Sequence, residues 1–369
     1  MHRISAEQRV VCEVLKGASE VKLPGVADAK FSTEVDASVL LDLFQRHRIL
    51  SLSSQIRSQL PPREKQTWKS LVQQRTMRSL KLFEETLNLI NVLKEAGIEA
   101  IPLKGAFLGY QLYNDPGKRH FNDVDLLINP EDLEKVTEIL ANQGYQKVYP
   151  APLNERQFKT YSFYKKDIGL RNPEKNVFIE LHYGFHVHRL LKKADEAALR
   201  QNRETIHIKN EPYQVLDAET TFFYLVFHGC LHQYFRLFWL KDIADWMQTH
   251  DLHYQKVKEL FKTTGLERML FVTLQLLKDY FNKELPEELT ATDFYTSKLF
   301  KNSNSYSKRI NRLVNICHMR IQGMENETTR LKFARHYFLL NLKPGLAYKF
   351  TVLWSILQRK RIRKYMGGN

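Results

Sequence analysis

The stretch that most constrains the fold places a lysine–glycine pair between a predicted strand and a predicted helix. Residues 98–103 read Ile-Glu-Ala-Ile-Pro-Leu and predict a short strand. Lys104 and Gly105 form the turn, and a helix is expected over 106–113 immediately afterwards. Backbone amides at a helix N-terminus attract anions, and a glycine beside them lets a phosphate approach closely. The stretch therefore predicts a phosphate-binding turn.

A second stretch, 121–128, places two carboxylates one residue apart. It reads Phe-Asn-Asp-Val-Asp-Leu-Leu-Ile and is expected to form a strand. Because side chains alternate across a strand, Asp123 and Asp125 are expected on one face, with Val124 turned to the core. Two such acids repel each other unless a cation neutralises them, and Mg²⁺ binds through one or two carboxylates together with substrate phosphates. This pair predicts a metal site.

The residues that follow predict a small mixed sheet. A helix is expected over 131–143, and strands over 145–149, 158–164 and 177–183, the second of these because aromatic and polar residues alternate. Strands mixed with helices in this order are typical of an α/β core.

One acid stands out in the last of these strands. Glu180 lies between Ile179 and Leu181, and strand alternation places it on the same face as His182. A half-buried carboxylate needs a partner. That partner is either a metal, shared with the earlier acids, or a structural salt bridge, since ion-pair networks resemble functional sites.

Together the acids suit two-metal phosphoryl chemistry. Asp123 and Asp125 would hold the metal that carries a triphosphate, and Glu180 would complete a second metal site with them. Glu180 could also take the proton from an attacking hydroxyl.

Other residues could hold the nucleotide. Lys104 and the amides after Gly105 would hold phosphates, with Arg119 as a second charged ligand. His182 could support the metal ligands or stack on the base. Asp242 could face the nucleotide or stabilise a helix contact.

Helices flank this core on both sides. A long amphipathic helix is expected over 63–95, ended by Gly97, and the chain from Asp217 onward reads as helical. The expected organisation is α+β, with an N-terminal helical region over 1–96, an α/β core over 97–210, and a C-terminal helical domain with a basic tail over 211–369.

Charge and composition bound the partners. The net charge is +15, and residues 298–369 hold 16 Lys and Arg against two acids, so this segment carries nearly all of the excess. Such a segment suggests a polyanionic partner, although a solvated surface would look the same. No apolar run reaches the roughly 18 residues of a membrane span. The first residues lack a secretory signal, and the three cysteines have no metal spacing, so we expect a cytoplasmic protein.

Several of these motifs together resemble a known family. Leu103-Lys-Gly-Ala106, Leu112-Tyr-Asn-Asp-Pro-Gly117, Arg119, the segment 123–128 and Glu180-Leu-His-Tyr183 are similar to bacterial nucleotidyltransferases of the DNA polymerase β superfamily. The most similar group has Lys-Gly in the turn, where the superfamily usually has Gly-Ser or Gly-Gly. The resemblance extends over about 65–250, including Trp239–Asp245 in the helical half.

The resemblance implies a minimal nucleotidyltransferase sheet, Mg²⁺ or Mn²⁺, and an NTP, with ATP the expected nucleotide. The reaction would transfer NMP to an acceptor and release pyrophosphate. The acceptor could be a small molecule, a sugar, a peptide or an RNA. The alternative is a non-catalytic nucleotide- or RNA-binding protein on a degraded core. Such a core would be expected to lack a carboxylate, and none of the three is missing here.

Overall fold

The computed structural model describes residues 5–16, 35–185, 190–290, 303–322, 334, 337–343, 348–350 and 352–353. The chain divides into two compact units. We call one the helical unit; it comprises Met1–Thr76, Phe222–Lys262 and Leu266–Leu342. We call the other the sheet unit; it comprises Met77–Thr221, Thr263–Gly265 and Lys343–Asn369.

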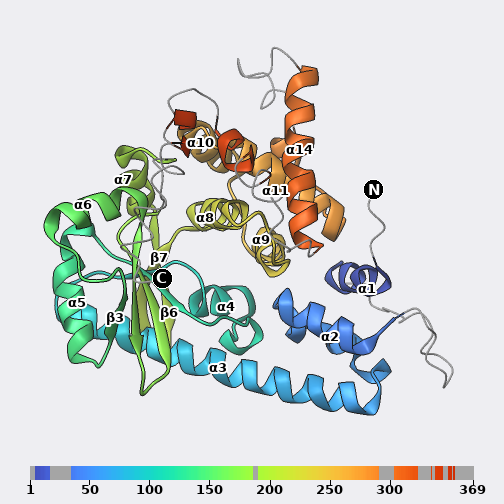
Figure 1. The fold of residues 1–369 in the computed structure, drawn as a ribbon, viewed down its shortest axis with the longest axis horizontal. Helices are drawn as coiled ribbons and strands as arrows, with labels where there is room; N and C mark the ends of the chain where they lie inside the picture. Colours follow the sequence, from blue (N-terminus) through green and yellow to red (C-terminus); the bar gives the residue numbers. More distant parts are fainter. Residues whose placement is uncertain are drawn as a thin grey trace. The chain divides into compact units, whose positions relative to one another are not determined.

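A five-stranded mixed sheet forms the centre of the sheet unit (Figure 1). Its strands are β1 (Ile101–Pro102), β2 (Val124–Leu127), β3 (Gln146–Tyr149), β4 (Asp167–Asn172) and β5 (Val177–His182). The spatial order is β1-β2-β5-β4-β3, with β2 and β5 parallel and the other neighbours antiparallel. The parallel pair brings together two strands that are far apart in the sequence.

Helices and a hairpin surround this sheet. The helical elements are α4 (Ala106–Tyr113), η2 (Pro116–Lys118), η3 (Pro130–Asp132), α5 (Leu133–Asn142), α6 (Glu155–Tyr164) and α7 (Lys193–Gln201). The hairpin consists of β6 (Arg203–Ile208) and β7 (Glu211–Leu216). The expected α+β architecture, with a mixed sheet and flanking helices, is confirmed.

The long amphipathic helix is present as α3 (Pro62–Glu95), and its C-terminal part packs on the core of the sheet unit. Phe83 contacts the rings of Phe107 and Tyr110, so α4 lies beside α3 (Figure 1). Gly97 has φ +74°, as the sequence predicted for a glycine that ends a helix. The core also takes in apolar residues from β2, β5, α5 and the hairpin.

The prediction of a strand over 158–164 is wrong, because these residues belong to α6. Asn154 caps the helix in a reciprocal capping box with Gln157. Phe158 and Tyr161 are three residues apart, so they share a face of a helix, whereas in a strand they would point to opposite faces. The capping signal, which precedes the aromatic run, decides between the two readings.

The β6–β7 hairpin was not predicted. Its turn residues Lys209 and Asn210 have φ values of +52° and +68°, as in a two-residue turn with both central residues left-handed. Glycine usually marks such turns, and this one has none. The hairpin supplies Ile208, Tyr213 and Val215 to the core.

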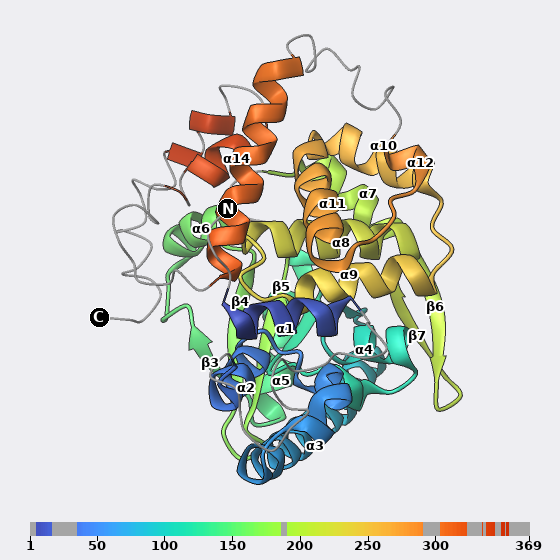
Figure 2. The same ribbon diagram turned by 90° about the vertical axis from the view of Figure 1, so that its right-hand side faces the viewer.

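The helical unit holds the remaining helices. They are α1 (Ala6–Leu15), α2 (Ala37–Arg46), η1 (Leu50–Gln59), most of α8 (Ala218–Leu231), α9 (Phe238–Thr249), α10 (Tyr254–Thr264), α11 (Glu267–Phe281), α12 (Glu287–Thr290) and α14 (Ser303–Ile321). Within this unit α11 packs against α9 and α14, and α1 packs against α2 and α11 (Figure 2). Asp217 caps α8 through the Thr220 amide at 2.9 Å, as expected. None of the helices in the described residues could span a membrane.

The predicted division into 1–96, 97–210 and 211–369 stays a prediction about domains. The two compact units follow other boundaries, since the N-terminal helices and most of the helices after 222 fall in one unit. The basic tail at 359–364 lies outside the described residues.

Candidate metal and nucleotide site

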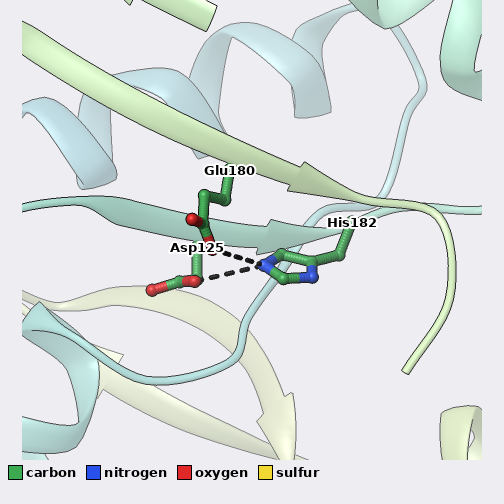
Figure 3. A group of neighbouring side chains, drawn as sticks. All are labelled: Asp125, Glu180 and His182. Carbon is green, nitrogen blue, oxygen red and sulfur yellow. Dashed lines mark hydrogen bonds and ion pairs between the residues drawn. The ribbon is translucent and has the colours of Figure 1, made fainter. Parts of the chain in front are cut away.

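Asp125, Glu180 and His182 converge on one face of the sheet (Figure 3). Strand register accounts for this, because Asp125 of β2 lies directly opposite Glu180 of β5 in the parallel pair. His182 is two residues beyond Glu180 and so points to the same face. One ligand atom from each residue lies within 4.8 Å of the others, which is compact enough for one metal ion.

The imidazole of His182 lies between the two carboxylates. Its Nε2 is 3.1 Å from Oδ1 of Asp125 and 3.6 Å from Oε2 of Glu180. The side chain of Asp125 is fully buried and that of His182 almost so, whereas Glu180 keeps 31% of its side chain exposed. The cluster is therefore open to solvent through Glu180.

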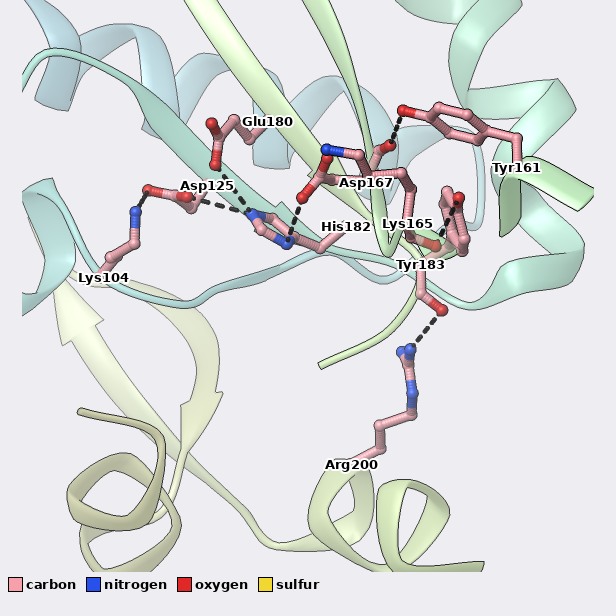
Figure 4. Close-up of polar contacts among 9 residues, drawn as sticks. All are labelled: Lys104, Asp125, Tyr161, Lys165, Asp167, Glu180, His182, Tyr183 and Arg200. Atoms are coloured by element: carbon pink, nitrogen blue, oxygen red, sulfur yellow. Dashed lines mark hydrogen bonds and ion pairs between the residues drawn. The ribbon is translucent and has the colours of Figure 1, made fainter. Parts of the chain in front are cut away.

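The second oxygen of Asp125 contacts Lys104. The ammonium nitrogen lies 2.6 Å from Oδ2, and the Lys104 side chain is only 11% exposed (Figure 4). Lys104 comes from the turn between β1 and α4, and the next residue toward β1, Leu103, donates its amide to the Asp125 carbonyl at 3.2 Å. Both carboxylate oxygens of Asp125 thus have a nitrogen partner.

Asp167 is a further acid at this cluster that sequence reasoning missed. It starts β4, opposite His182 in the antiparallel register, and its Oδ2 lies 3.9 Å from His182 Nδ1 (Figure 4). Tyr161 of α6 donates its hydroxyl to the Asp167 carbonyl at 3.0 Å. No local motif marks Asp167, because only strand pairing brings it to His182.

The carboxylates of the cluster are held in their ionised form. Burial would raise the pKa of Asp125, but the charge of Lys104 and the hydrogen bond to His182 outweigh it, so this pKa lies below its usual range. Burial acts likewise on Glu180, and the bond to His182 and the charge of Lys104 bring its pKa to about 2. Ionised oxygens are what a cation requires.

The basic groups respond to the same neighbours. Burial and the nearby Lys166 act to lower the pKa of His182, but Asp125, Glu180 and Asp167 outweigh them and raise it. Burial lowers the pKa of Lys166, although Asp167 opposes this effect. Lys166 is a second lysine at the cluster that the sequence analysis did not single out.

An aromatic side chain borders the cluster. Gly169 of β4 lies opposite Glu180, and Tyr149 of β3 lies opposite Gly169. A Cβ at Gly169 would come within 2.2 Å of the Tyr149 ring, so the ring packs directly over this glycine. Burial and the charges of Asp167 and Glu180 raise the pKa of Tyr149, which keeps its hydroxyl protonated as a donor.

Asp123 does not lie on the strand, contrary to the sequence-based expectation. It occupies the bend before β2, because pairing with β5 begins only at Val124. Strand alternation therefore does not fix its direction. Its charge nevertheless raises the pKa of Glu180, so it is close enough to contribute to the field of the cluster. Its role as a metal ligand stays a prediction.

Gly105 in the turn before α4 has a backbone conformation that favours glycine. Gly105 has φ +66° and ψ −122°, a region that residues with a side chain rarely adopt, and α4 begins at the next residue. Arg119 is buried and donates Nη1 to the Gly105 carbonyl at 3.1 Å. This hydrogen bond holds the backbone of the turn in place. Direct contact between Arg119 and a phosphate stays a prediction.

Asp242 belongs to α9 in the helical unit and is buried. The predicted contact between Asp242 and a nucleotide stays a prediction.

The donor set of the cluster fits a divalent cation. Carboxylates are suitable ligands for Mg²⁺ and Mn²⁺. The imidazole of His182 would also be a suitable ligand for transition metals. If His182 instead stays on Asp125, it orients that carboxylate, as groups beside metal ligands commonly do.

Comparison with known proteins identifies a family for this chain. The model of a family described as uncharacterised nucleotidyltransferase matches residues 33–282, more than half of the chain. The chain belongs to this nucleotidyltransferase family. No curated protein and no solved structure gives a significant match. The matched segment of this nucleotidyltransferase family member includes the whole five-stranded sheet and the cluster at Asp125.

Proposed function

We propose that the protein is a metal-dependent nucleotidyltransferase that transfers NMP from an NTP, with ATP the expected nucleotide, to an acceptor nucleophile. The observation that carries this proposal is the convergence of Asp125, Glu180 and His182 beside the turn at Lys104. Carboxylates suited to a divalent cation and a lysine suited to a phosphate share one site, as phosphoryl transfer requires.

Asp125 and Glu180, with Asp123, would hold Mg²⁺ or Mn²⁺, which supplies charge neutralisation and alignment at the transferred phosphorus. The α4 amides after Gly105 would hold phosphate oxygens, and Arg119 would keep that turn in shape. Glu180, with a pKa of about 2, is suited to permanent ligation and poorly suited to accept a proton at neutral pH. The acceptor is a small molecule, a sugar, a peptide or an RNA, and the basic 298–369 segment would favour a polyanion.

Calorimetric binding of the four NTPs, with Mn²⁺ and with EDTA, tests the proposal. We expect metal-dependent binding in the wild type and at least about 100-fold weaker binding in Asp123→Asn and Glu180→Gln, because charge and ligands are lost. Glu134→Gln removes an exposed carboxylate of α5 and should bind like the wild type.

Binding that is equal with and without metal, or equal in all variants, would contradict the proposal. Turnover is then measured as pyrophosphate release with mixtures of acceptors of each class. Metal-dependent binding without release in any mixture would favour the non-catalytic alternative.

A further inference from the structure

We propose that Lys104 is a built-in counter-ion of the metal site. Its ammonium group would leave Asp125 when a divalent cation binds and would then pair with the triphosphate. The inference rests on the proposed function and adds the order of events at its site. Metal and nucleotide would then bind cooperatively, because the movement of Lys104 couples the two sites.

Both carboxylate oxygens of Asp125 already have a nitrogen partner. Lys104 Nζ is 2.6 Å from Oδ2, and His182 Nε2 is 3.1 Å from Oδ1. A buried carboxylate needs such compensation, because an unpaired charge is costly away from water. A cation that binds Asp125 must therefore displace one of these two partners or share an oxygen with it.

Of these two partners, Lys104 is the one that can leave Asp125. His182 is held within β5, with its Nε2 also 3.6 Å from Glu180 and its Nδ1 3.9 Å from Asp167. Lys104 pairs with Asp125 from a bend outside the strand, so the hydrogen bonds of the sheet do not hold its backbone. A lysine carries its charge on a flexible four-carbon stem, so it can change partner without backbone movement.

An ammonium group that leaves Asp125 stays close to the predicted phosphate-binding turn. Lys104 immediately precedes Gly105, and the first amides of α4 follow at once. A freed ammonium therefore remains within one side-chain length of the turn where a triphosphate would lie. Metal binding frees Lys104 to pair with the triphosphate. A bound triphosphate in turn keeps Lys104 from competing with the metal for Asp125. Such coupling is reciprocal.

A nearby lysine provides a matched control. Lys166 acts on Asp125 and Glu180 through its charge, yet within the described part of the chain it makes no ion pair with either. Lys166→Met removes one positive charge near the cluster but leaves the ion pair between Lys104 and Asp125 in place. A purely electrostatic effect would appear in both lysine variants, whereas an exchange of partners would appear only in Lys104→Met.

The first experiment measures Mn²⁺ binding without nucleotide, from the electron paramagnetic resonance signal of free Mn²⁺. Lys104→Met should bind Mn²⁺ at least about tenfold more tightly than the wild type, because no ammonium has to be displaced. Lys104→Arg and Lys166→Met should stay within about threefold of the wild type. Equal or weaker Mn²⁺ binding by Lys104→Met overturns the inference. Loss of Mn²⁺ binding in Asp125→Asn separates this failure from failure of the metal site itself.

A second experiment uses the unaltered protein, so it does not depend on the folding of a variant. Lysines are acetylated briefly and the extent at Lys104 is read by mass spectrometry, with the exposed Lys209 as the reference. Lys104 should be protected in EDTA, several-fold more reactive with Mn²⁺, and protected again with Mn²⁺ and a non-hydrolysable NTP analogue. Unchanged reactivity of Lys104 on Mn²⁺ binding would refute the exchange. If Mn²⁺ does not bind at all, the proposed function fails as well.

Discussion

Two buried histidines, one in each unit, have opposite electrostatic surroundings. His182 of the sheet unit lies among Asp125, Glu180 and Asp167, and its pKa is raised. His47 of the helical unit is equally buried, but burial and the charges of Arg46 and Arg236 lower its pKa to about 3. Burial acts in the same direction on both rings. The neighbouring charges decide the outcome, so burial alone does not mark a functional histidine.

The two rings also differ in their partners. His47 Nδ1 accepts a hydrogen bond from the Leu237 amide at 3.3 Å, and the His47 carbonyl accepts one from Phe238. These bonds join α2 to the start of α9 within the helical unit. His47 is a neutral structural residue, whereas the surroundings of His182 are those of a cation site.

The largest effect is expected from removing the charge at the centre of the His182 cluster. Asp125→Asn leaves Lys104 and His182 without their shared anion, and the free energy of unfolding should fall by about 3–5 kcal/mol. Nucleotidyl transfer should be abolished. His47→Gln should cost about 1–3 kcal/mol by weakening one buried bond, with metal binding unchanged. Urea denaturation measures both variants.

Asp132→Asn is the control for that substitution, since Asp132 is a half-buried acid of the sheet unit outside the cluster. It should change the free energy of unfolding by no more than about 0.5 kcal/mol. Equal losses in Asp125→Asn and Asp132→Asn would show that the cluster holds no special charge balance.

Opposite pH dependences are expected for the two histidines. The unfolded chain protonates His47 below about pH 6.5, whereas the folded protein resists protonation down to about pH 3. The stability of the wild type relative to His47→Gln should therefore fall as the pH is lowered from 6.5. The contribution of His182 is complete below pH 6.5 and should be lost as the pH rises through its raised pKa. Each slope is at most about 1.4 kcal/mol per pH unit.

The measurement is urea denaturation from pH 5 to 8 in EDTA for the wild type, His47→Gln and His182→Gln. Slopes of the same sign for both histidines would contradict the contrast between their surroundings.

The smallest effect is expected at an exposed ion pair of similar length. Lys209 Nζ lies 2.7 Å from a carboxylate oxygen of Glu84, close to the 2.6 Å between Lys104 and Asp125, but the side chains of Lys209 and Glu84 are 63% and 59% exposed. Glu84→Gln should change the free energy of unfolding by about 0–1 kcal/mol and leave nucleotide binding unaffected. A loss comparable to that of Asp125→Asn would show that distance, rather than burial, sets the strength of these pairs.

Local patterns predicted much of the secondary structure and singled out Asp125, Glu180, His182 and Lys104, but not Asp167 or Lys166. The helices α3 and α4, the strands β3 and β5, and the cap at Asp217 all follow from periodicity, turns and caps that lie within a few residues. Glu180 stood out because an acid interrupts an apolar strand. The same logic failed at 158–164, where strict alternation covers only residues 161–163 and the capping box at Asn154 marks a helix.

Side-chain period and turn residues act locally, so the chain alone was enough to predict most of the helices and strands and to single out the candidate carboxylates. Which of these groups meet depends on how the strands pair. The parallel pairing of β2 with β5 sets Asp125 against Glu180, and the pairing of β4 with β5 adds Asp167. The contact between Lys104 and Asp125 follows from the position of β1 beside β2. Strand pairing joins residues far apart in the chain, and no local pattern encodes such a partner.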